Sequence, residues 1–214
     1  MIGCEDMKTI YLIRHSAPFV EIENYEDFNN TLWKDINRNM ILSTIGEENA
    51  KKLCNVEELN HIDAVYSSDS FRSIGTAKYI AEKNHCKIRL DKRMNERELG
   101  VEKIQELPDN YNIDSFQNKD FKIGFGESIN EVNLRFNNFM NEIIHNSKNK
   151  IALFVHGILL MAYLQEITDF EFDGMNLKVE WNQNKIYYGP MKNPMVFQLT
   201  FDNDVLLDIK QIEV

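Results

Sequence analysis

The chain has 214 residues, of which 43% are hydrophobic and 11% aromatic, and it carries a formal net charge of −10. A chain of this length and composition is able to bury a core, which excludes a disordered protein and favours a single domain over residues 1–214. The acidic balance excludes a general nucleic-acid surface, because no block of Lys and Arg appears, although it leaves room for one small basic pocket.

No run approaches the roughly 18 consecutive apolar residues of a membrane helix. The first ten residues carry acids where a secretory signal needs a basic start and an apolar middle. We therefore expect a cytoplasmic protein that does not associate with a membrane. Cys4, Cys54 and Cys86 show no CxxC spacing, so we expect ordinary thiols rather than a disulfide framework or a zinc site.

Short β-rich runs alternate along the chain with segments of helical periodicity. In chain order, the pattern predicts a strand at 8–13, a helix at 44–59, strands at 62–67 and 87–90 around a helix at 70–83, a helix at 128–146, a strand at 151–155 and a helix at 157–166. The C-terminal residues 194–214 read as a hairpin that turns at Asp202-Asn203-Asp204. This alternation predicts an α/β fold, a three-layer α/β/α sandwich with a mainly parallel central sheet.

Two of the predicted helices begin with capping-box patterns. Ser128 and Glu131 have the S-x-x-E spacing ahead of a helical apolar stripe, and Thr44 with Glu47 shows the same spacing. Both patterns predict the residue at which a helix begins.

Charged side chains follow three of the predicted strands. The first strand ends at Arg14 and His15, the strand at 62–67 leads to Arg72 in the next helix, and IALFV ends at His156. Ligands of open α/β sheets bind beyond the carboxyl ends of the strands, so these groups are expected to converge. Guanidinium groups and helix N-termini suit phosphoryl oxygens. The sequence therefore predicts a phosphate pocket.

Several motifs, in this order, resemble those of the histidine phosphatase superfamily, whose fold is phosphoglycerate mutase-like. They are LIRHSAP, SSDSFRSIGTA, MNERELG, GFGES followed by Arg135, and ALFVHG; LSTIGEENA also resembles a helix start of this family. The resemblance extends over about residues 8–160. It implies the phosphoglycerate mutase-like sandwich and an enzyme that transfers phosphoryl groups.

Carried over to this sequence, the resemblance implies that His15 is the nucleophile and forms a phosphohistidine. Arg14, Arg72 and His156 would bind the phosphoryl oxygens, with His156 also counted as catalytic, and Glu96 would be the proton donor. Neutral imidazole is a competent nucleophile near pH 7, and a covalent intermediate divides a difficult displacement into two steps. This chemistry implies no metal and no other cofactor.

The sequence departs from the family pattern just after the predicted nucleophile. The usual glycine is replaced by Ser16, whose hydroxyl is expected to donate to the phosphate, so Ser16 joins the predicted phosphate-binding residues. The asparagine that follows a few residues later in the family is not evident in APFVEIENYEDF.

The other polar residues of these motifs are expected to have no direct part in the chemistry. Arg97 and Glu98 are expected to be solvated or ion-paired at the surface. Glu127 and Arg135 are expected to be structural. The remaining histidines lie among polar residues at element ends and are expected at the surface: His61, His85 and His145.

Two segments are candidate walls of the pocket. The first is residues 19–40, with Phe28 and Trp33. The second is residues 101–126, whose aromatic side chains suit either a lid or a packed surface loop, with the loop slightly favoured. These aromatic residues are Tyr111, Phe116, Phe121 and Phe125.

Within the family, the short segment at 101–126, which has lysines but no arginine, favours a metal-independent phosphomonoesterase, a histidine acid-type phosphatase, over a mutase. The expected partner is a small phosphorylated substrate of unknown identity. A module of the same fold that binds phospho-ligands or proteins without catalysis is a further alternative, which the retention of all five chemical groups disfavours. A nucleotide-binding α/β protein would need a glycine-rich loop after the first strand, and RHSAPF has no glycine.

Overall fold

The computed structural model describes residues 7–19 and 33–214, and the side chains of 33, 34 and 36 are outside this description. Cys4 and the candidate wall residue Phe28 therefore lie outside the described residues, as does the side chain of Trp33. No helix in the described ranges is long and apolar enough to cross a bilayer.

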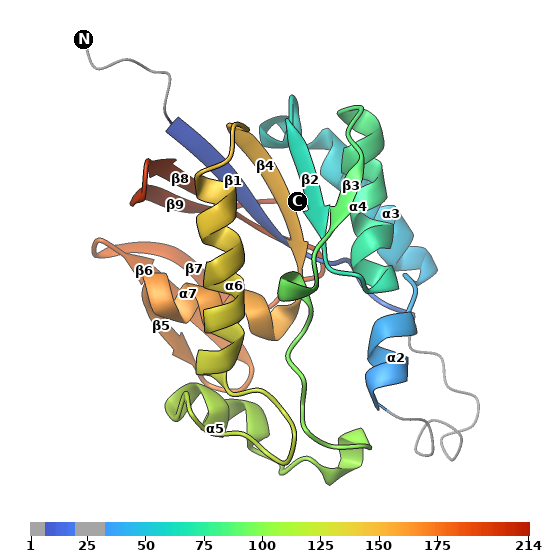
Figure 1. The fold of residues 1–214 in the computed structure, drawn as a ribbon, viewed down its shortest axis with the longest axis vertical. Helices are drawn as coiled ribbons and strands as arrows, with labels where there is room; N and C mark the ends of the chain where they lie inside the picture. Colours follow the sequence, from blue (N-terminus) through green and yellow to red (C-terminus); the bar gives the residue numbers. More distant parts are fainter. Residues whose placement is uncertain (1–6, 20–32) are drawn as a thin grey trace.

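A six-stranded sheet forms the centre of the molecule (Figure 1). Its spatial order is β3 (Ile88–Leu90), β2 (Ala64–Ser67), β4 (Lys150–Val155), β1 (Met7–Arg14), β8 (Met195–Asp202) and β9 (Val205–Ile212). The first four strands pair in parallel, whereas β8 and β9 are antiparallel. The predicted mainly parallel sheet and the C-terminal hairpin are thus confirmed.

Helices cover both faces of this sheet. The helices α6 (Ile129–Ile144) and α7 (Gly157–Ile167) pack on one face, and α3 (Thr44–Lys52) and α4 (Phe71–Lys83) lie on the other (Figure 1). Successive residues of a strand point to opposite faces. In β1, accordingly, Leu12 belongs to the apolar cluster of α6 and α7, while Ile13 belongs to the opposite cluster. The predicted three-layer sandwich is therefore the observed architecture.

A second, three-stranded antiparallel sheet packs on the α6–α7 side and was not predicted. It consists of β5 (Asp169–Phe172), β6 (Asn176–Trp181) and β7 (Asn184–Pro190). Leu177 and Val179 of β6 are fully buried, while the alternate residues face outward. The turn between β6 and β7 has positive φ at Asn182 and Gln183. The sequence has no Asn-Gly or Asp-Gly pair here, which is the usual signal for such a turn.

The predicted helix at 44–59 is shorter than expected. The α-helix α3 ends at Lys52 and is followed by two 3₁₀ turns, η1 (Leu53–Asn55) and η2 (Glu57–Leu59). Its N-cap is Ser43, whose hydroxyl accepts from the Gly46 amide, so the predicted cap at Thr44 is wrong by one residue. The capping box of Ser128 and Glu131 at the start of α6 is confirmed.

Residues 101–126 form a packed surface segment with two short helices, η4 (Ile104–Glu106) and α5 (Tyr111–Gln117). Tyr111 and Phe116 are buried, and the Phe116 ring packs against two phenylalanines of β5. Phe125 is 71% exposed. The structure therefore favours the interpretation of residues 101–126 as a packed loop over a lid, because none of them lines the cavity described below.

Candidate active site

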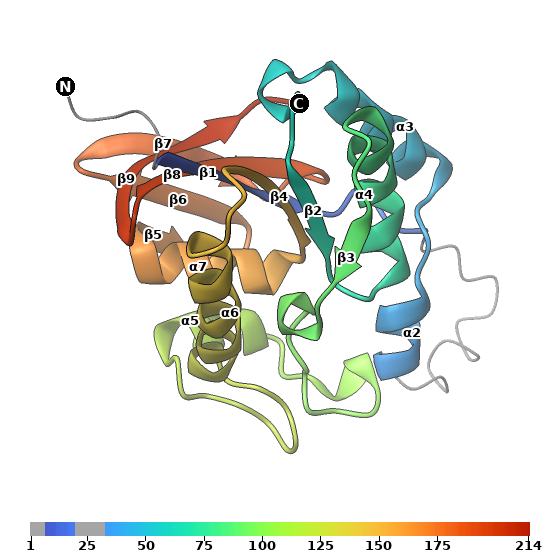
Figure 2. The same ribbon diagram turned by 45° about the horizontal axis from the view of Figure 1, so that its top comes forward.

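The carboxyl ends of β1, β2 and β4 lie near the points where α4 and α7 begin (Figure 2), and three of the predicted site residues are on or next to these elements. His15 follows β1 directly, Arg72 lies in the first turn of α4, and His156 is the N-cap of α7. The parallel pairing of these strands brings residues that are far apart in sequence to one edge of the sheet.

The imidazole of His15 has a defined partner at each nitrogen. Its Nδ1 lies 2.7 Å from the carbonyl oxygen of Ser16, and the Nε of Arg72 donates to its Nε2 at 3.0 Å. A carbonyl only accepts and a guanidinium only donates, so the proton is on Nδ1 and the lone pair is on Nε2. Burial, and then the charge of Arg72, lower the pKa of His15 well below its usual value of 6.5. The ring is therefore neutral with Nε2 unprotonated.

Arg72 connects the two histidines and a helix outside the sheet. Its Nη2 donates to Nδ1 of His156 at 2.9 Å and to Oδ1 of Asn37 at 2.6 Å, and its Nη1 donates to the carbonyl oxygen of Asn37. Asn37 belongs to the short helix α2 (Trp33–Asn39). Burial lowers the pKa of Arg72 to about 10, so the guanidinium remains charged at neutral pH. Two oxygens of Asn37 thus occupy the outward side of this cation.

His156 is fully buried beside His15, with the two ring centroids 5.2 Å apart. Its Nε2 lies 2.7 Å from the hydroxyl oxygen of Ser68. Desolvation, followed by the charge of Arg72, lowers the pKa of His156 well below 6.5. Because Arg72 donates to Nδ1, the neutral ring carries its proton on Nε2 and donates to Ser68.

Arg14 approaches the same point from the end of β1. Its Nη1 donates to the carbonyl oxygens of Met191 and Lys192, at 3.0 and 3.1 Å. Its Nε is buried and has no hydrogen-bond partner among the described residues. A Cβ on Gly157 would lie 3.3 Å from this Nε, tighter than ordinary van der Waals contact, so the glycine leaves room for the guanidinium at the start of α7. The Nε–H of Arg14 is therefore a hydrogen-bond donor at the site that has no partner among the described residues.

Glu96 is held at the first turn of α7. Its carboxylate accepts from the amides of Ile158 and Leu159, at 3.1 and 3.2 Å, and from the amide of Arg97 at 2.9 Å. A carboxylate at a helix N-terminus is stabilised by the unpaired amides and by the helix dipole. This contact fixes Glu96 beside the helix whose N-cap is His156.

Arg97 holds the segment that carries Glu96 against the residues around 121–127. The prediction that Arg97 lies at the surface was wrong. Arg97 is fully buried, donates to the carbonyl oxygens of Phe121 and Glu127, and lies 4.6 Å from the ring centroid of Tyr111. A charged motif suggests solvation, but here carbonyl groups and an aromatic face replace the water. Glu98, in contrast, is exposed as predicted.

Glu127 and Arg135 form an ion pair that supports the same segment. The Nε of Arg135 lies 2.6 Å from a carboxylate oxygen of Glu127, and its Nη1 donates to the carbonyl oxygen of Arg93 at 2.7 Å. The predicted structural role of this pair agrees with these contacts. His61, His85 and His145 are all exposed, also as predicted.

The Ser16 hydroxyl, which was predicted to contact the phosphate, has another partner in this structure. Ser16 is fully buried, its hydroxyl donates to the carbonyl oxygen of Gly46 at 2.7 Å, and its amide donates to the hydroxyl of Thr76 at 2.9 Å. The side chain is directed into the packing between α3 and α4, because a buried hydroxyl binds the nearest carbonyl. Ser16 therefore connects the loop after β1 to α3 rather than contributing a donor to the site.

A cavity of about 250 Å³ opens at this cluster and is reached by both His156 and Glu96. Its outer wall comes from three segments, at residues 35–38, 69–70 and 92–98. Of the predicted site residues, Arg14, His15, Arg72, His156 and Glu96 are brought together, whereas Ser16 is not.

One family model matches residues 10–189, and its description is the histidine phosphatase superfamily, branch 1. The chain belongs to this superfamily. The mycobacterial glucosyl-3-phosphoglycerate phosphatase is similar in structure, with a TM-score of 0.67 at 18% identity over 96% of this chain and 97% of that one. A phosphoglycerate mutase from Bacillus anthracis has a TM-score of 0.65 at 16% identity, covering 97% and 93% of the two chains. A putative α-ribazole-5′-P phosphatase from Escherichia coli has a TM-score of 0.64 at 16% identity, covering 97% and 96%.

No curated protein matches the sequence significantly. At these identities, the structural likeness shows the histidine phosphatase fold and leaves the reaction and the substrate to be argued from the residues.

Residues 35–38 line the cavity and belong to the segment 19–40 that was predicted as a candidate wall. Several single polar residues of the cavity were not found from the sequence, among them Asn37, Ser70 and Asn95. Asn37 contacts Arg72, Asn95 accepts at Oδ1 from the amide of Asp69 at 3.2 Å, and Ser70 lines the cavity. The family asparagine was sought close to His15, and Asn37 is much further along the chain, on a separate helix. No local pattern links the two positions.

Proposed function

We propose that the protein is a metal-independent phosphomonoesterase that acts through a phosphohistidine on His15. The single observation that carries the proposal is the pair of contacts made by the His15 ring, in which Nδ1 lies at the Ser16 carbonyl oxygen and Nε2 accepts from Nε of Arg72 at 3.0 Å. From these contacts we infer that the ring is neutral, with its lone pair on Nε2. A nucleophile beside a fixed cation is suited to attack on a phosphate dianion.

In the proposed first step, the hydrogen bond from Arg72 Nε to Nε2 of His15 is released, so that Nε2 attacks phosphorus and the bond from phosphorus to the ester oxygen breaks. Glu96 accepts from amides as a carboxylate in the free site, so the proposal requires that it takes up a proton from solvent and then gives it to the departing oxygen, and the product leaves as an alcohol. Arg14 and Arg72 hold the other phosphoryl oxygens, where charge develops in an in-line transfer, and His156 joins them when its Nε2–H turns from Ser68 to the phosphate. The buried Nε of Arg14, which lacks a partner in the described ranges, supports this role.

In the second step, water attacks the phosphohistidine while Glu96 accepts its proton. The nitrogen–phosphorus bond breaks, and phosphate leaves with the neutral imidazole restored. The two oxygens of Asn37 on Arg72 are in positions that a phosphate would take, so we infer that the substrate displaces Asn37. These side chains supply the nucleophile, the cations and the acid, so the proposed steps use no metal and no cofactor.

The substrate is proposed to be a small phosphorylated molecule. One structural neighbour is named for glucosyl-3-phosphoglycerate and another for α-ribazole-5′-P, both small phosphate esters. The cavity of about 250 Å³ is consistent with a leaving group of modest size.

The test is hydrolysis of p-nitrophenyl phosphate in the presence of EDTA by the wild type and by His15→Ala. We expect phosphate release by the wild type and a loss of roughly 10⁴-fold or more in the variant, since no other group replaces the nucleophile. His145→Ala, which removes an exposed histidine at the end of α6, is the matched control and should retain full activity. Circular dichroism checks that both variants fold.

Full activity of His15→Ala would overturn the proposal. Isomerisation of 3-phosphoglycerate in the presence of 2,3-bisphosphoglycerate, without release of phosphate, would assign the site to a mutase instead. Binding of phosphate with no turnover of any ester would assign the protein to a non-catalytic phospho-ligand module.

A further inference from the structure

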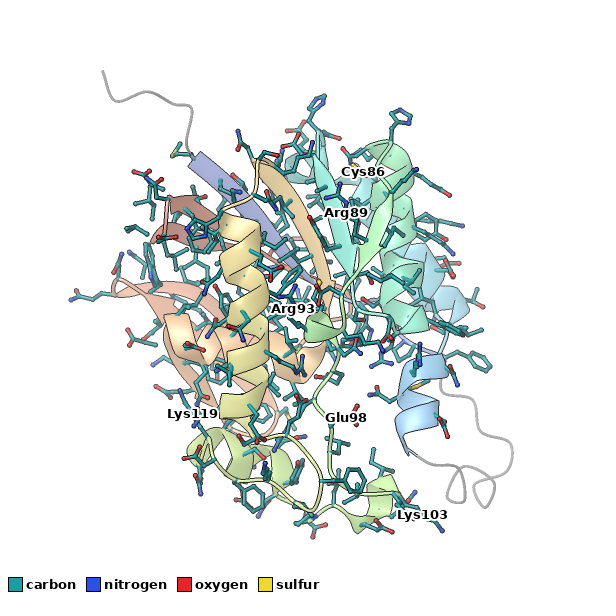
Figure 3. All side chains as sticks on the ribbon, in the orientation of Figure 1. Cys86, Arg89, Arg93, Glu98, Lys103 and Lys119 are labelled. Carbon is teal, nitrogen blue, oxygen red and sulfur yellow. The ribbon has the colours of Figure 1, made fainter. Side chains whose placement is uncertain are left out.

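The proposed proton donor and the proposed nucleophile are supported by different parts of the chain. Figure 3 shows Glu98 on the segment from β3 to η4, which also carries the proposed proton donor. His15, in contrast, follows the end of β1. Arg14, the last residue of β1, pairs with Met195, the first residue of β8. The connection from β7 to β8, residues 191–194, is therefore brought to the loop that contains the nucleophile.

This connection contacts Arg14 through its backbone. The carbonyl oxygens of Met191 and Lys192 accept from Nη1 of Arg14, at 3.0 and 3.1 Å. They hold one end of the guanidinium, while its Nε has no hydrogen-bond partner among the described residues. Because a backbone carbonyl is present whatever the side chain, this support does not depend on which residues occupy positions 191 and 192.

Asn193 contacts the nucleophile through its side chain. Its Nδ2 donates to the backbone carbonyl oxygen of His15 at 3.1 Å, although the two residues are 178 positions apart in sequence. A carbonyl only accepts, so the group of Asn193 that faces it is the NH₂ of the amide. The family model matches residues 10–189 and ends before Asn193, so no motif of the family predicts this contact.

The same peptide group has a second partner on its other side. The amide of Ser16, which shares this peptide bond with the carbonyl of His15, donates to Oγ1 of Thr76 in α4 at 2.9 Å. The bond is trans, so its C=O and N–H point in opposite directions, and Asn193 and Thr76 hold the peptide group from opposite sides. The His15 ring is attached directly to this group, so a change in the orientation of the group moves Nε2.

We propose that Asn193 is a positioning residue of the proposed reaction, whose amide sets the orientation of the His15 ring for attack on phosphorus. The proposal deepens the proposed function and rests on it. Asn193 acts through the backbone of His15 rather than on the substrate. An in-line attack needs the reacting atoms about 3–3.5 Å apart with the lone pair aligned, and a displacement of about 1 Å is able to lower the rate about 10²-fold.

This role separates attack from binding. The guanidinium groups of Arg14 and Arg72 are the proposed phosphate ligands, and neither receives a hydrogen bond from the side chain of Asn193. Loss of the Asn193 amide should therefore leave the affinity for phosphate in place and impair the attack of Nε2. An interaction that acts only in the transition state affects kcat/KM without a matching change in the binding of the ground state.

The test compares the wild type with Asn193→Leu, whose side chain has a similar size but no donor. For hydrolysis of p-nitrophenyl phosphate with EDTA present, we expect kcat/KM to fall about tenfold to a hundredfold. The inhibition constant of inorganic phosphate should change by less than about twofold. Orthovanadate accepts a fifth ligand and resembles the transition state, so its inhibition should weaken by about the same factor as kcat/KM. Vanadate is measured without EDTA, which binds it.

Asn184→Leu is the matched control. Asn184 also donates through its side-chain amide to a backbone carbonyl, that of Asn182, but it lies at the turn between β6 and β7, and its loss should leave kcat/KM unchanged. Asn193→Ala removes the same donor without adding an apolar group and is measured in parallel, in case the leucine does not fit. Circular dichroism checks the fold of each variant.

Unchanged kcat/KM in a folded Asn193 variant would overturn the positioning role and leave the phosphatase function standing. Equal weakening of the inhibition by phosphate and by vanadate would also overturn it, because Asn193 would then support binding rather than attack. If the wild type hydrolyses neither p-nitrophenyl phosphate nor any other ester, the proposed function itself fails and this inference fails with it.

Discussion

The residues of the His15 cluster (Arg14, His15, Arg72 and His156) lie at the ends of buried strands or on the helices that follow them. The outer wall lies mostly on surface segments, at residues 35–38 and 92–98, and includes residues 69–70 between β2 and α4. His15, Arg72 and His156 are between 0% and 5% exposed, and each has partners on other elements. Asp35 and Glu98 are exposed. Under the proposed function, the difference suits a fold that serves many substrates, since the sheet would fix the groups that act on the phosphoryl group and the surface segments would contact the leaving group.

Glu96 lies where these two regions meet, and its replacement is the largest expected effect. Glu96→Gln should lower kcat for an alkyl phosphate by roughly 10²-fold or more, because the amide has no proton to give to a poor leaving group. For p-nitrophenyl phosphate the loss should be much smaller, since p-nitrophenolate leaves without protonation. Steady-state kinetics on both substrates measures the difference.

Glu213→Gln, an exposed carboxylate near the C-terminus, is the control for the loss of one charge. Equal losses of Glu96→Gln on the two substrates would contradict the role of proton donor and would leave Glu96 only its structural contact with α7.

A second prediction concerns the energetic cost of burying the two histidines. The folded-state pKa values of His15 and His156 are well below 6.5, the usual value that applies when the chain is unfolded. The unfolded state therefore binds more protons than the folded state below pH 6.5. The contribution of the two neutral histidines to the free energy of unfolding is complete above that pH and is lost as the pH falls. The free energy of unfolding should decrease by up to about 1.4 kcal/mol per pH unit for each histidine.

Urea denaturation between pH 5 and pH 8 measures this slope in the wild type and in His15→Asn and His156→Asn. Each variant should reduce the slope by the contribution of one histidine. A slope that persists in both buried-site variants would mean that other groups carry it.

Sequence patterns predicted the His15 cluster because its members stand next to strands. A strand end is a local feature, and parallel pairing places such ends together whatever the rest of the chain does. Arg14, His15, Arg72 and His156 were found in this way, with Glu96 added by the family motif. The same reasoning predicted the central sheet and the helices on its two faces.

Contacts between distant segments were beyond the reach of these patterns. The partner of Arg72 on α2, Asn37, has no signal near His15, and the burial of Arg97 depends on carbonyl groups more than twenty residues away in sequence. The second sheet was missed for a different reason. Its alternation at Leu177, Lys178 and Val179 was present in the sequence but lay beyond the last family motif.

A substitution at Ser16 should lower the stability of the protein without changing the chemistry of the His15 cluster. Ser16→Ala removes the hydroxyl that donates to the carbonyl oxygen of Gly46 and keeps the backbone carbonyl that accepts from His15. We expect a loss of about 1–2 kcal/mol in the free energy of unfolding, because a buried acceptor loses its partner, with kcat almost unchanged. Urea denaturation and p-nitrophenyl phosphate kinetics measure the two quantities. A large fall in kcat at normal stability would restore Ser16 to the phosphate site.

The smallest expected effect is at Asn37, the residue of the outer wall that contacts the His15 cluster. Its side-chain oxygen accepts from Nη2 of Arg72 at 2.6 Å, on the side of the guanidinium that we assign to the phosphate. Asn37→Ala removes this competitor, so inorganic phosphate should inhibit the variant about two- to fivefold more tightly, as expected for one hydrogen bond to a charged group partly offset by water. Inhibition constants against p-nitrophenyl phosphate measure the change.

Asn39→Ala, at the exposed last residue of the same helix, is the control for an effect of the substitution on α2 itself. Weaker inhibition in Asn37→Ala would show that the Asn37 amide turns to donate to phosphate rather than yielding its place. In that case the boundary between the two regions shifts. The fixed machinery would then extend beyond the strand ends and include one residue of α2, and the surface segments would contribute to the chemistry as well as to the choice of the leaving group.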